Sequence, residues 1–212
     1  MSAAKGRAGA GRAGAGRAGA TPRIRVEPAT RERWGDLVRL FGPRGACAGC
    51  WCMWWRRPAA AWRAGRGEGN RRALRRLVDS GPPPGVIAYD GKDPVGWCAL
   101  APRGEYLRLA AARTLKPIDE TPVWSVTCFF VARSHRRRGV TVALLKGAAA
   151  HAARSGAKML EGYPVEPRKG AIADAFAWTG LAGAFRKAGF KEAARPSPSR
   201  PIMRRALRAP RS

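Results

Sequence analysis

The stretch CFFVARSHRRRGVTVALL, residues 128–145, contains the transition that decides the fold. An apolar run ends at Val131, a short polar loop follows, and a second apolar run begins after Gly139. A run such as the first is typical of a strand buried on both faces, whereas the residues after the glycine are typical of an apolar helix. The sequence therefore predicts a buried strand over 123–131 and a helix over about 139–155.

The junction between this strand and this helix is suited to bind an anion. The first amides of a helix have no acceptor within the helix, and the N-terminal end carries a partial positive charge. Gly139 has no Cβ and lets a ligand approach the backbone, while Arg136, Arg137 and Arg138 add positive charge. We expect a phosphate-binding loop in which the backbone supplies the geometry and the arginine side chains surround it.

Alternating strand and helix patterns extend outward from this junction. Strand 23–28 precedes Thr30, a suitable N-cap for a helix over 31–41. The other predicted elements are a helix over about 70–78, a hairpin over 85–100, a strand over 157–165, a helix over 176–189 and a last strand over 201–204. This order predicts one α/β domain over 23–205.

The chain ends are basic and differ in composition from the middle. Residues 1–22 include three GRAGA repeats and are expected to form a disordered arm, and residues 206–212 form a basic tail. With 41 lysines and arginines against 14 acidic residues, the net charge of +27 predicts weak, non-specific binding of nucleic acid through the tails. The alternative is that the arginines reflect a GC-rich genome.

The composition also indicates the compartment and the state of the thiols. The sequence shows neither a long uncharged apolar run nor a secretory signal, which predicts a cytoplasmic protein without a membrane segment. The five cysteines are expected to be free. Cys47, Cys50 and Cys52 lie close together, but a structural zinc site needs four ligands and no second pair has suitable spacing, so no metal is predicted.

Two motifs resemble those of the GNAT superfamily of N-acetyltransferases. Arg136-x-x-Gly139-x-Thr141, five residues after Val131, is similar to its acyl-CoA motif, and FRKAGF at 185–190 is similar to its Tyr-x-x-x-Gly-Phe. The chain further resembles a subgroup with Cys-Trp-Cys-Met, here Cys50 to Met53, and Gly-Tyr-Pro-Val, here Gly162 to Val165. The resemblance covers about 23–205 and implies a mixed, mostly antiparallel sheet flanked by helices.

The resemblance implies that acetyl-CoA is the co-substrate and that its acetyl group passes to an amine by direct attack. The tryptophans at 51–55 suggest an enclosed site and therefore the amine of a small molecule. It assigns the pantetheine arm and the pyrophosphate to main-chain groups of Phe129, Phe130, Val131, Arg136, Arg137, Arg138, Gly139, Val140 and Thr141. Thr141 replaces a smaller residue, and Phe185 replaces the tyrosine that often protonates the thiolate. Phe185 leaves a CoA-binding protein without turnover as one alternative, and the basic ends leave a nucleic-acid-associated protein as the other.

The acceptor side of the site is less defined by the sequence. Glu161 and Tyr163, which share a face of the predicted strand, and Glu105 are candidates for acid and base catalysis; Glu161 is equally suited to pair with an arginine. Trp51, Trp54 and Trp55 either line an aromatic acceptor pocket or pack as a lid on the core. His151 is expected on the helix surface, and the oligomeric state is not predicted.

Overall fold

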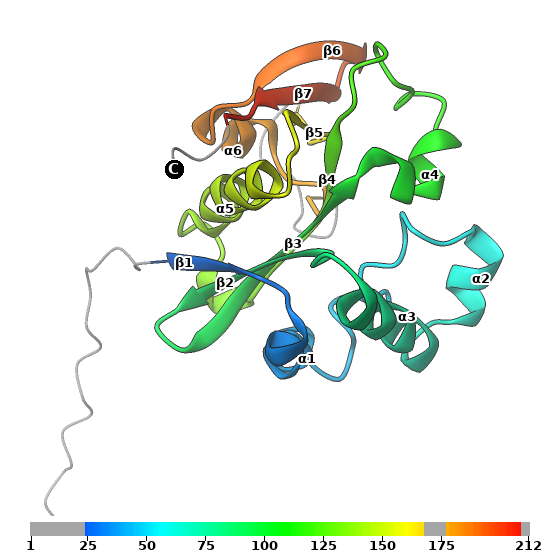
Figure 1. Ribbon diagram of the computed structural model, residues 1–212, viewed down its shortest axis with the longest axis vertical. Coiled ribbons are helices and arrows are strands. Elements are labelled where there is room, and N and C mark those ends of the chain that lie inside the picture. Colours follow the sequence, from blue (N-terminus) through cyan, green and yellow to red (C-terminus); the bar gives the residue numbers. More distant parts are fainter. Residues whose placement is uncertain (1–23, 168–176, 209–212) are drawn as a thin grey trace, which may run out of the picture.

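The computed structural model describes residues 24–167 and 177–208 and contains one seven-stranded sheet in the order β1-β2-β3-β4-β5-β7-β6 (Figure 1). The strands are β1 (Ile24–Pro28), β2 (Gly85–Asp90), β3 (Asp93–Pro102), β4 (Trp124–Val131), β5 (Met159–Gly162), β6 (Lys191–Ser197) and β7 (Arg200–Ala206). β4 and β5 run parallel, whereas the other neighbouring strands are antiparallel. The predicted mixed, mostly antiparallel α/β fold is confirmed.

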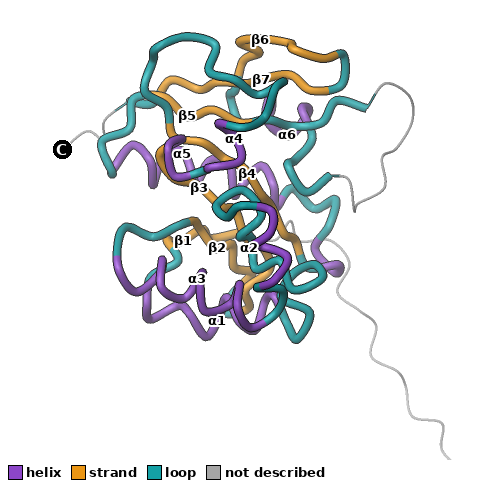
Figure 2. Tube along the Cα trace, turned by 90° about the vertical axis from the view of Figure 1, so that its right-hand side faces the viewer, coloured by secondary structure: helices purple, strands orange, loops and turns teal. Residues whose placement is uncertain are grey.

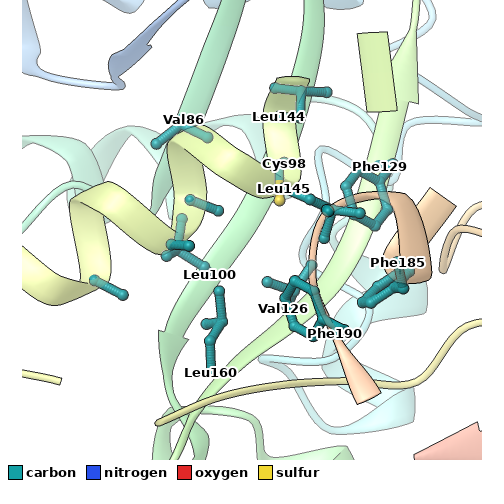
Figure 3. Close-up of a cluster of buried hydrophobic side chains, with 14 of the residues drawn as sticks. Val86, Cys98, Leu100, Val126, Phe129, Leu144, Leu145, Leu160, Phe185 and Phe190 are labelled. Carbon is teal, nitrogen blue, oxygen red and sulfur yellow. The ribbon is translucent and has the colours of Figure 1, made fainter. Parts of the chain in front are cut away.

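Helices cover both faces of this sheet (Figures 1 and 2). They are α1 (Trp34–Phe41), α2 (Ala59–Ala64), α3 (Glu68–Ser80), α4 (Leu107–Ala110), α5 (Val140–Arg154) and α6 (Ala182–Lys187). Side chains of α5 and α6 pack with Val86, Leu100 and Val126 in one core (Figure 3). Side chains of α1 and α3 pack on the opposite face with Ile87 and Trp97. Neighbouring strand residues such as Val86 and Ile87 thus contribute to cores on opposite faces of the sheet.

Several predicted boundaries were wrong. Residues 177–181 are not helical, and α6 begins only at Ala182, after a turn in which Gly180 has φ +86°. Thr30 makes no side-chain cap; its carbonyl instead accepts the Arg33 amide. The helices α2 and α4 were not predicted because six and four residues are too few to show a period. The arm predicted for 1–22 and residues 209–212 of the predicted tail lie outside the described residues.

β4 and β5 are hydrogen-bonded neighbours over only part of their length. Their pairing covers Trp124–Val126 opposite Leu160–Gly162, after which β5 ends while β4 continues to Val131. The aromatic ring of Phe185, from α6, lies where the strands part. Its ring centroid is 6.0 Å from that of Phe129 on β4, and an added Cβ on Gly162 would come within 2.2 Å of it. Phe185 therefore has a packing role, and residues 127–131 of β4 face a gap in the sheet.

His151 gives the fold a predicted dependence on pH. Contrary to expectation, it is buried in α5, with 6% of its surface exposed, and its ring contacts that of Trp124. Burial lowers its pKa from 6.5, with Arg154 acting in the same direction. As the pH falls, the His151 imidazole takes up a proton more readily in the unfolded chain than in the folded chain. Its contribution to the free energy of unfolding is therefore complete above the unfolded-state pKa and decreases as the pH drops below that value.

We expect the urea midpoint to fall between pH 7.5 and pH 5.5, and the substitution His151→Gln to reduce this fall. The measurement is equilibrium unfolding at the two pH values. His135→Gln is the control because His135 pairs with Asp90 near the surface and should leave the fall in place. An equal pH dependence in His151→Gln and the unsubstituted protein would contradict the assignment.

None of the helices in the described ranges is both long and apolar enough to cross a membrane.

Candidate active site

The loop between β4 and α5 has the geometry of an anion-binding cradle. Arg137 and Gly139 both adopt left-handed backbone conformations, with φ +61° and +79°, and Gly139 is the N-cap of α5. Within the described part of the chain, the amides of residues 137–142 donate to no main-chain acceptor outside the helix. Successive amides at a turn leading into a helix form a concave, positively polarised surface, which is suited to a phosphate group.

The side chains around this cradle agree with a backbone-based site. Val140 is buried and anchors the start of α5, whereas Arg137, Arg138 and Gly139 are exposed and Thr141 is half-buried. Arg136 donates from Nε to the Val131 carbonyl at 3.3 Å and so ties the loop to the end of β4. A Cβ on Gly139 would meet no protein atom within 4 Å, so the surface beside it is open.

The free edge of β4 is covered by two tryptophans. The Phe129 amide donates to the Trp178 carbonyl at 2.7 Å, and the Trp55 indole donates to the Thr127 carbonyl at 3.1 Å. The two indole rings lie 5.6 Å apart, with 33° between their planes. Sequence reasoning missed this role of Trp178 because the residue fell inside a predicted helix.

Glu161 lies in an ion-pair network on the face of the sheet opposite α5. Its carboxylate accepts from Arg103 at 3.0 Å and from Arg204 at 2.7 Å, and only 1% of the side chain is exposed. The Tyr163 hydroxyl donates to the same carboxylate at 2.7 Å and also contacts Ser125 at 2.8 Å. Both carboxylate oxygens are therefore occupied, which favours the arginine-pairing interpretation of Glu161 over that of a free base.

Tyr163 belongs to the same network. Burial, followed by the charge of Glu161, raises the pKa of its hydroxyl well above the usual value. The hydroxyl therefore stays protonated and acts as a hydrogen-bond donor. Glu105, the third candidate, lies in a short 3-10 turn, and its exposed carboxylate pairs with Arg56.

The three tryptophans of the segment 51–55 occupy different environments. Trp51 is 4% exposed and packs against Trp34 and Phe41 in the core of the α1 face. Trp54 contacts Trp62 and lies beneath the Arg108 guanidinium. Only Trp55 of the three hydrogen-bonds to β4, where the strands part. The core-packing interpretation thus applies to Trp51, whereas a role of Trp55 in an acceptor pocket stays a prediction.

The cysteines of the segment 47–52 and those of the sheet are free thiols. Cys52 and Cys128 are buried with their sulfurs 3.4 Å apart, and the five cysteines are free thiols. The pKa of Cys52 is raised, first by its hydrogen bond with the Cys128 thiol, then by burial and by the electrostatic interaction with Cys128. In the residues that the structure describes, no group of three or more His, Cys, Asp or Glu side chains is arranged to hold a metal ion.

Comparison with known proteins gives one family and many related folds. The model of the family described as "Acetyltransferase (GNAT) family" matches residues 51–174. No curated protein is significantly similar in sequence. The GNAT domain of S. lividans PAT is 17% identical with a TM-score of 0.50, over 87% of this chain and 90% of that one. An agmatine N-acetyltransferase mutant in its apo form is 14% identical with a TM-score of 0.52, over 87% of this chain and 99% of that one. At these sequence identities, the similarity to the two structures shows the fold alone.

Proposed function

The chain belongs to the acetyltransferase (GNAT) family, and from this premise we propose that it transfers the acetyl group of acetyl-CoA to the amine of a small molecule. The observation that carries the proposal is the cradle at residues 137–142, which opens beside the unpaired part of β4. A phosphate bound there would accept hydrogen bonds from several amides at the N-terminus of a 15-residue helix.

The residues of the cradle and of the unpaired part of β4 are suited to the two ends of acetyl-CoA, its pyrophosphate and its pantetheine arm. Arg137 and Arg138 add positive charge at the exposed mouth of the cradle, and the open surface beside Gly139 leaves room for the pyrophosphate. The extended arm would then follow the edge of β4 as an added strand. For this to occur, the Trp178 carbonyl must release the Phe129 amide, which then becomes a donor within the gap.

Acetyl-CoA supplies an activated acetyl group when bound. The protein therefore needs mainly to position the amine and to polarise the thioester carbonyl. The Phe129 amide, once released, can donate to the developing negative charge on the acetyl oxygen. Phe185 has no ionisable group and is 0% exposed, so it cannot supply a proton to the departing thiolate. Glu161 is held by two arginines. The amine is therefore expected to enter deprotonated, or to lose its proton to water, before attack.

A screen of primary amines with acetyl-CoA, following the release of free thiol, tests this function. We expect turnover of at least one small amine, together with saturable binding of acetyl-CoA in calorimetry. Binding without thiol release across the screen would favour a CoA-binding protein without turnover. Absence of binding by well-folded protein would contradict the assignment of the cradle.

A further inference from the structure

Three buried polar groups near the gap in the sheet have no hydrogen-bond partner within the described residues. They are the Tyr106 hydroxyl, the Thr127 hydroxyl and the Nη2 atom of Arg56. Tyr106 and Thr127 are each 1% exposed, and the Arg56 side chain is 6% exposed. Buried donors are nearly always satisfied in folded proteins, because an unmet hydrogen bond costs about 1–3 kcal/mol. A set of such groups in one place therefore indicates a ligand or ordered water.

These three side chains are neighbours. The Arg56 guanidinium lies over the Tyr106 ring, 4.7 Å from its centroid. The Thr127 and Tyr106 hydroxyls lie next to each other without meeting the geometry of a hydrogen bond. Burial raises the pKa of Tyr106 to about 12, which keeps its hydroxyl protonated at neutral pH. The cluster thus offers two hydroxyl donors and one guanidinium edge.

The cluster lies at the point where β5 leaves β4. Thr127 has no partner in β3, since Cys128 pairs with Ala99 and Val126 pairs with Leu100. It is the extra residue of a β-bulge, a distortion that redirects a side chain. Trp55 donates to the Thr127 carbonyl and packs on the hydrophobic cluster that contains Tyr106. The cluster is therefore adjacent to the edge of β4 on which the proposed transfer takes place.

The Arg56 guanidinium is only partly occupied and leaves one N–H edge for a hydrogen-bond acceptor. Glu105 pairs with Nη1 of Arg56 and leaves Nη2 unpaired. Arg108, whose amide donates to the Trp55 carbonyl, lies with its guanidinium over the Trp54 ring and also has a buried Nη1 without a partner among the described residues. In contrast, Arg103 and Arg204 are balanced by Glu161 and Asp119. The cluster thus has unused donors, one of them on a guanidinium group that its carboxylate partner contacts through the other nitrogen only.

We propose that Arg56, Tyr106 and Thr127 bind the carboxylate of the acceptor, so that the enzyme acts on amines that carry a carboxylate. An arginine edge and two hydroxyls match the acceptor oxygens of a carboxylate, and charge-assisted bonds of this kind are strong. Trp55 and Trp178 are half-buried and would contact an apolar or aromatic body between the two polar ends. The proposal rests on the proposed acetyltransferase function and specifies its substrate class.

Two amines that differ only in charge test the subsite: 4-(aminomethyl)benzoate and 4-(aminomethyl)benzamide. With acetyl-CoA present, we expect kcat/KM to favour the benzoate by roughly 10- to 100-fold, the range given by one or two charge-assisted hydrogen bonds. Tyr106→Phe and Thr127→Val remove one unpartnered hydroxyl each at nearly constant volume. Each should lower the preference by about fivefold or more, mainly through KM, and Arg56→Lys should lower it further.

Tyr89→Phe is the matched control, because Tyr89 lies on β2 and its hydroxyl donates to Asp36 of α1, so its loss should leave the preference unchanged. Equal turnover of both amines by the unsubstituted protein would overturn the carboxylate subsite and leave the acetyltransferase function intact. An unchanged preference in both hydroxyl variants would also overturn it and indicate that only water fills the cluster.

If neither amine is acetylated, calorimetry with the same two compounds still tests the subsite. Tighter binding of the benzoate, weakened in Tyr106→Phe and Thr127→Val, would support it even without turnover. Equal binding of the two compounds, or binding of neither, would overturn it. Failure of the proposed function and failure of the subsite are therefore distinguished.

Discussion

Gly139→Val is expected to abolish measurable binding of acetyl-CoA. Gly139 adopts φ +79°, a conformation that β-branched residues disfavour by about 1–3 kcal/mol. A valine would either shift the loop or place its side chain over the amides of residues 137–142, where the phosphates are proposed to lie. We expect the dissociation constant to rise by at least ~100-fold, consistent with the loss of two or more hydrogen bonds to a charged group.

Gly156→Val provides the matched control for this substitution. Gly156 follows the C-terminal end of the same helix, has φ +83°, and likewise has no atom within 4 Å of an added Cβ. It should carry a similar folding cost without affecting the cradle. Calorimetry with acetyl-CoA and thermal unfolding, applied to both variants, separate the two effects. Unchanged affinity in folded Gly139→Val would contradict the cradle, and so would an equal loss in both variants.

Glu161→Ala is expected to destabilise the fold by about 3–5 kcal/mol. The Glu161 carboxylate is 1% exposed and lies between Arg103 and Arg204, which are 14% and 12% exposed. Without it, the largely buried Arg103 guanidinium loses its carboxylate partner, Arg204 keeps only its pair with Asp119, and the Tyr163 hydroxyl loses an acceptor. Equilibrium unfolding in urea measures the free-energy difference.

An exposed ion pair gives the comparison for Glu161→Ala. Glu192 pairs with Arg195 near the surface, and such pairs contribute about 0–1 kcal/mol, so Glu192→Ala should have little effect. If Glu161→Ala were as mild as Glu192→Ala, the network would not stabilise the sheet. Glu161 would then again be a candidate for the catalytic base.

The order of the longer elements around residue 139 could be predicted from the sequence because local signals determine it, whereas α2, α4 and β6 were not predicted. The apolar run ending at Val131 and the glycine at 139 mark the strand, the loop and the helix by composition alone. The structure places the left-handed N-cap of α5 at that glycine. The anion cradle depends on neighbouring residues and on their main chain, so its position required no knowledge of distant contacts.

The acceptor side could not be predicted because its contacts join residues far apart in the chain. The bond between Trp55 and Thr127 spans 72 positions, and that between Arg103 and Glu161 spans 58. Nothing local distinguishes Trp55 from Trp51, yet one reaches β4 and the other fills the core. Likewise, the bulge at Thr127 is defined by the register of β4 with β3. No residue of the apolar run 123–131 indicates its position in the sequence.

The tryptophans at the parting of β4 and β5 also affect how the free protein behaves in solution. An unpaired strand edge is a template on which another chain can add a strand and begin to aggregate. Here the Phe129 amide and the Thr127 carbonyl are both occupied from within the chain, by Trp178 and Trp55. Where β5 has parted from β4, the chain thereby withholds two main-chain groups of β4 from other polypeptides.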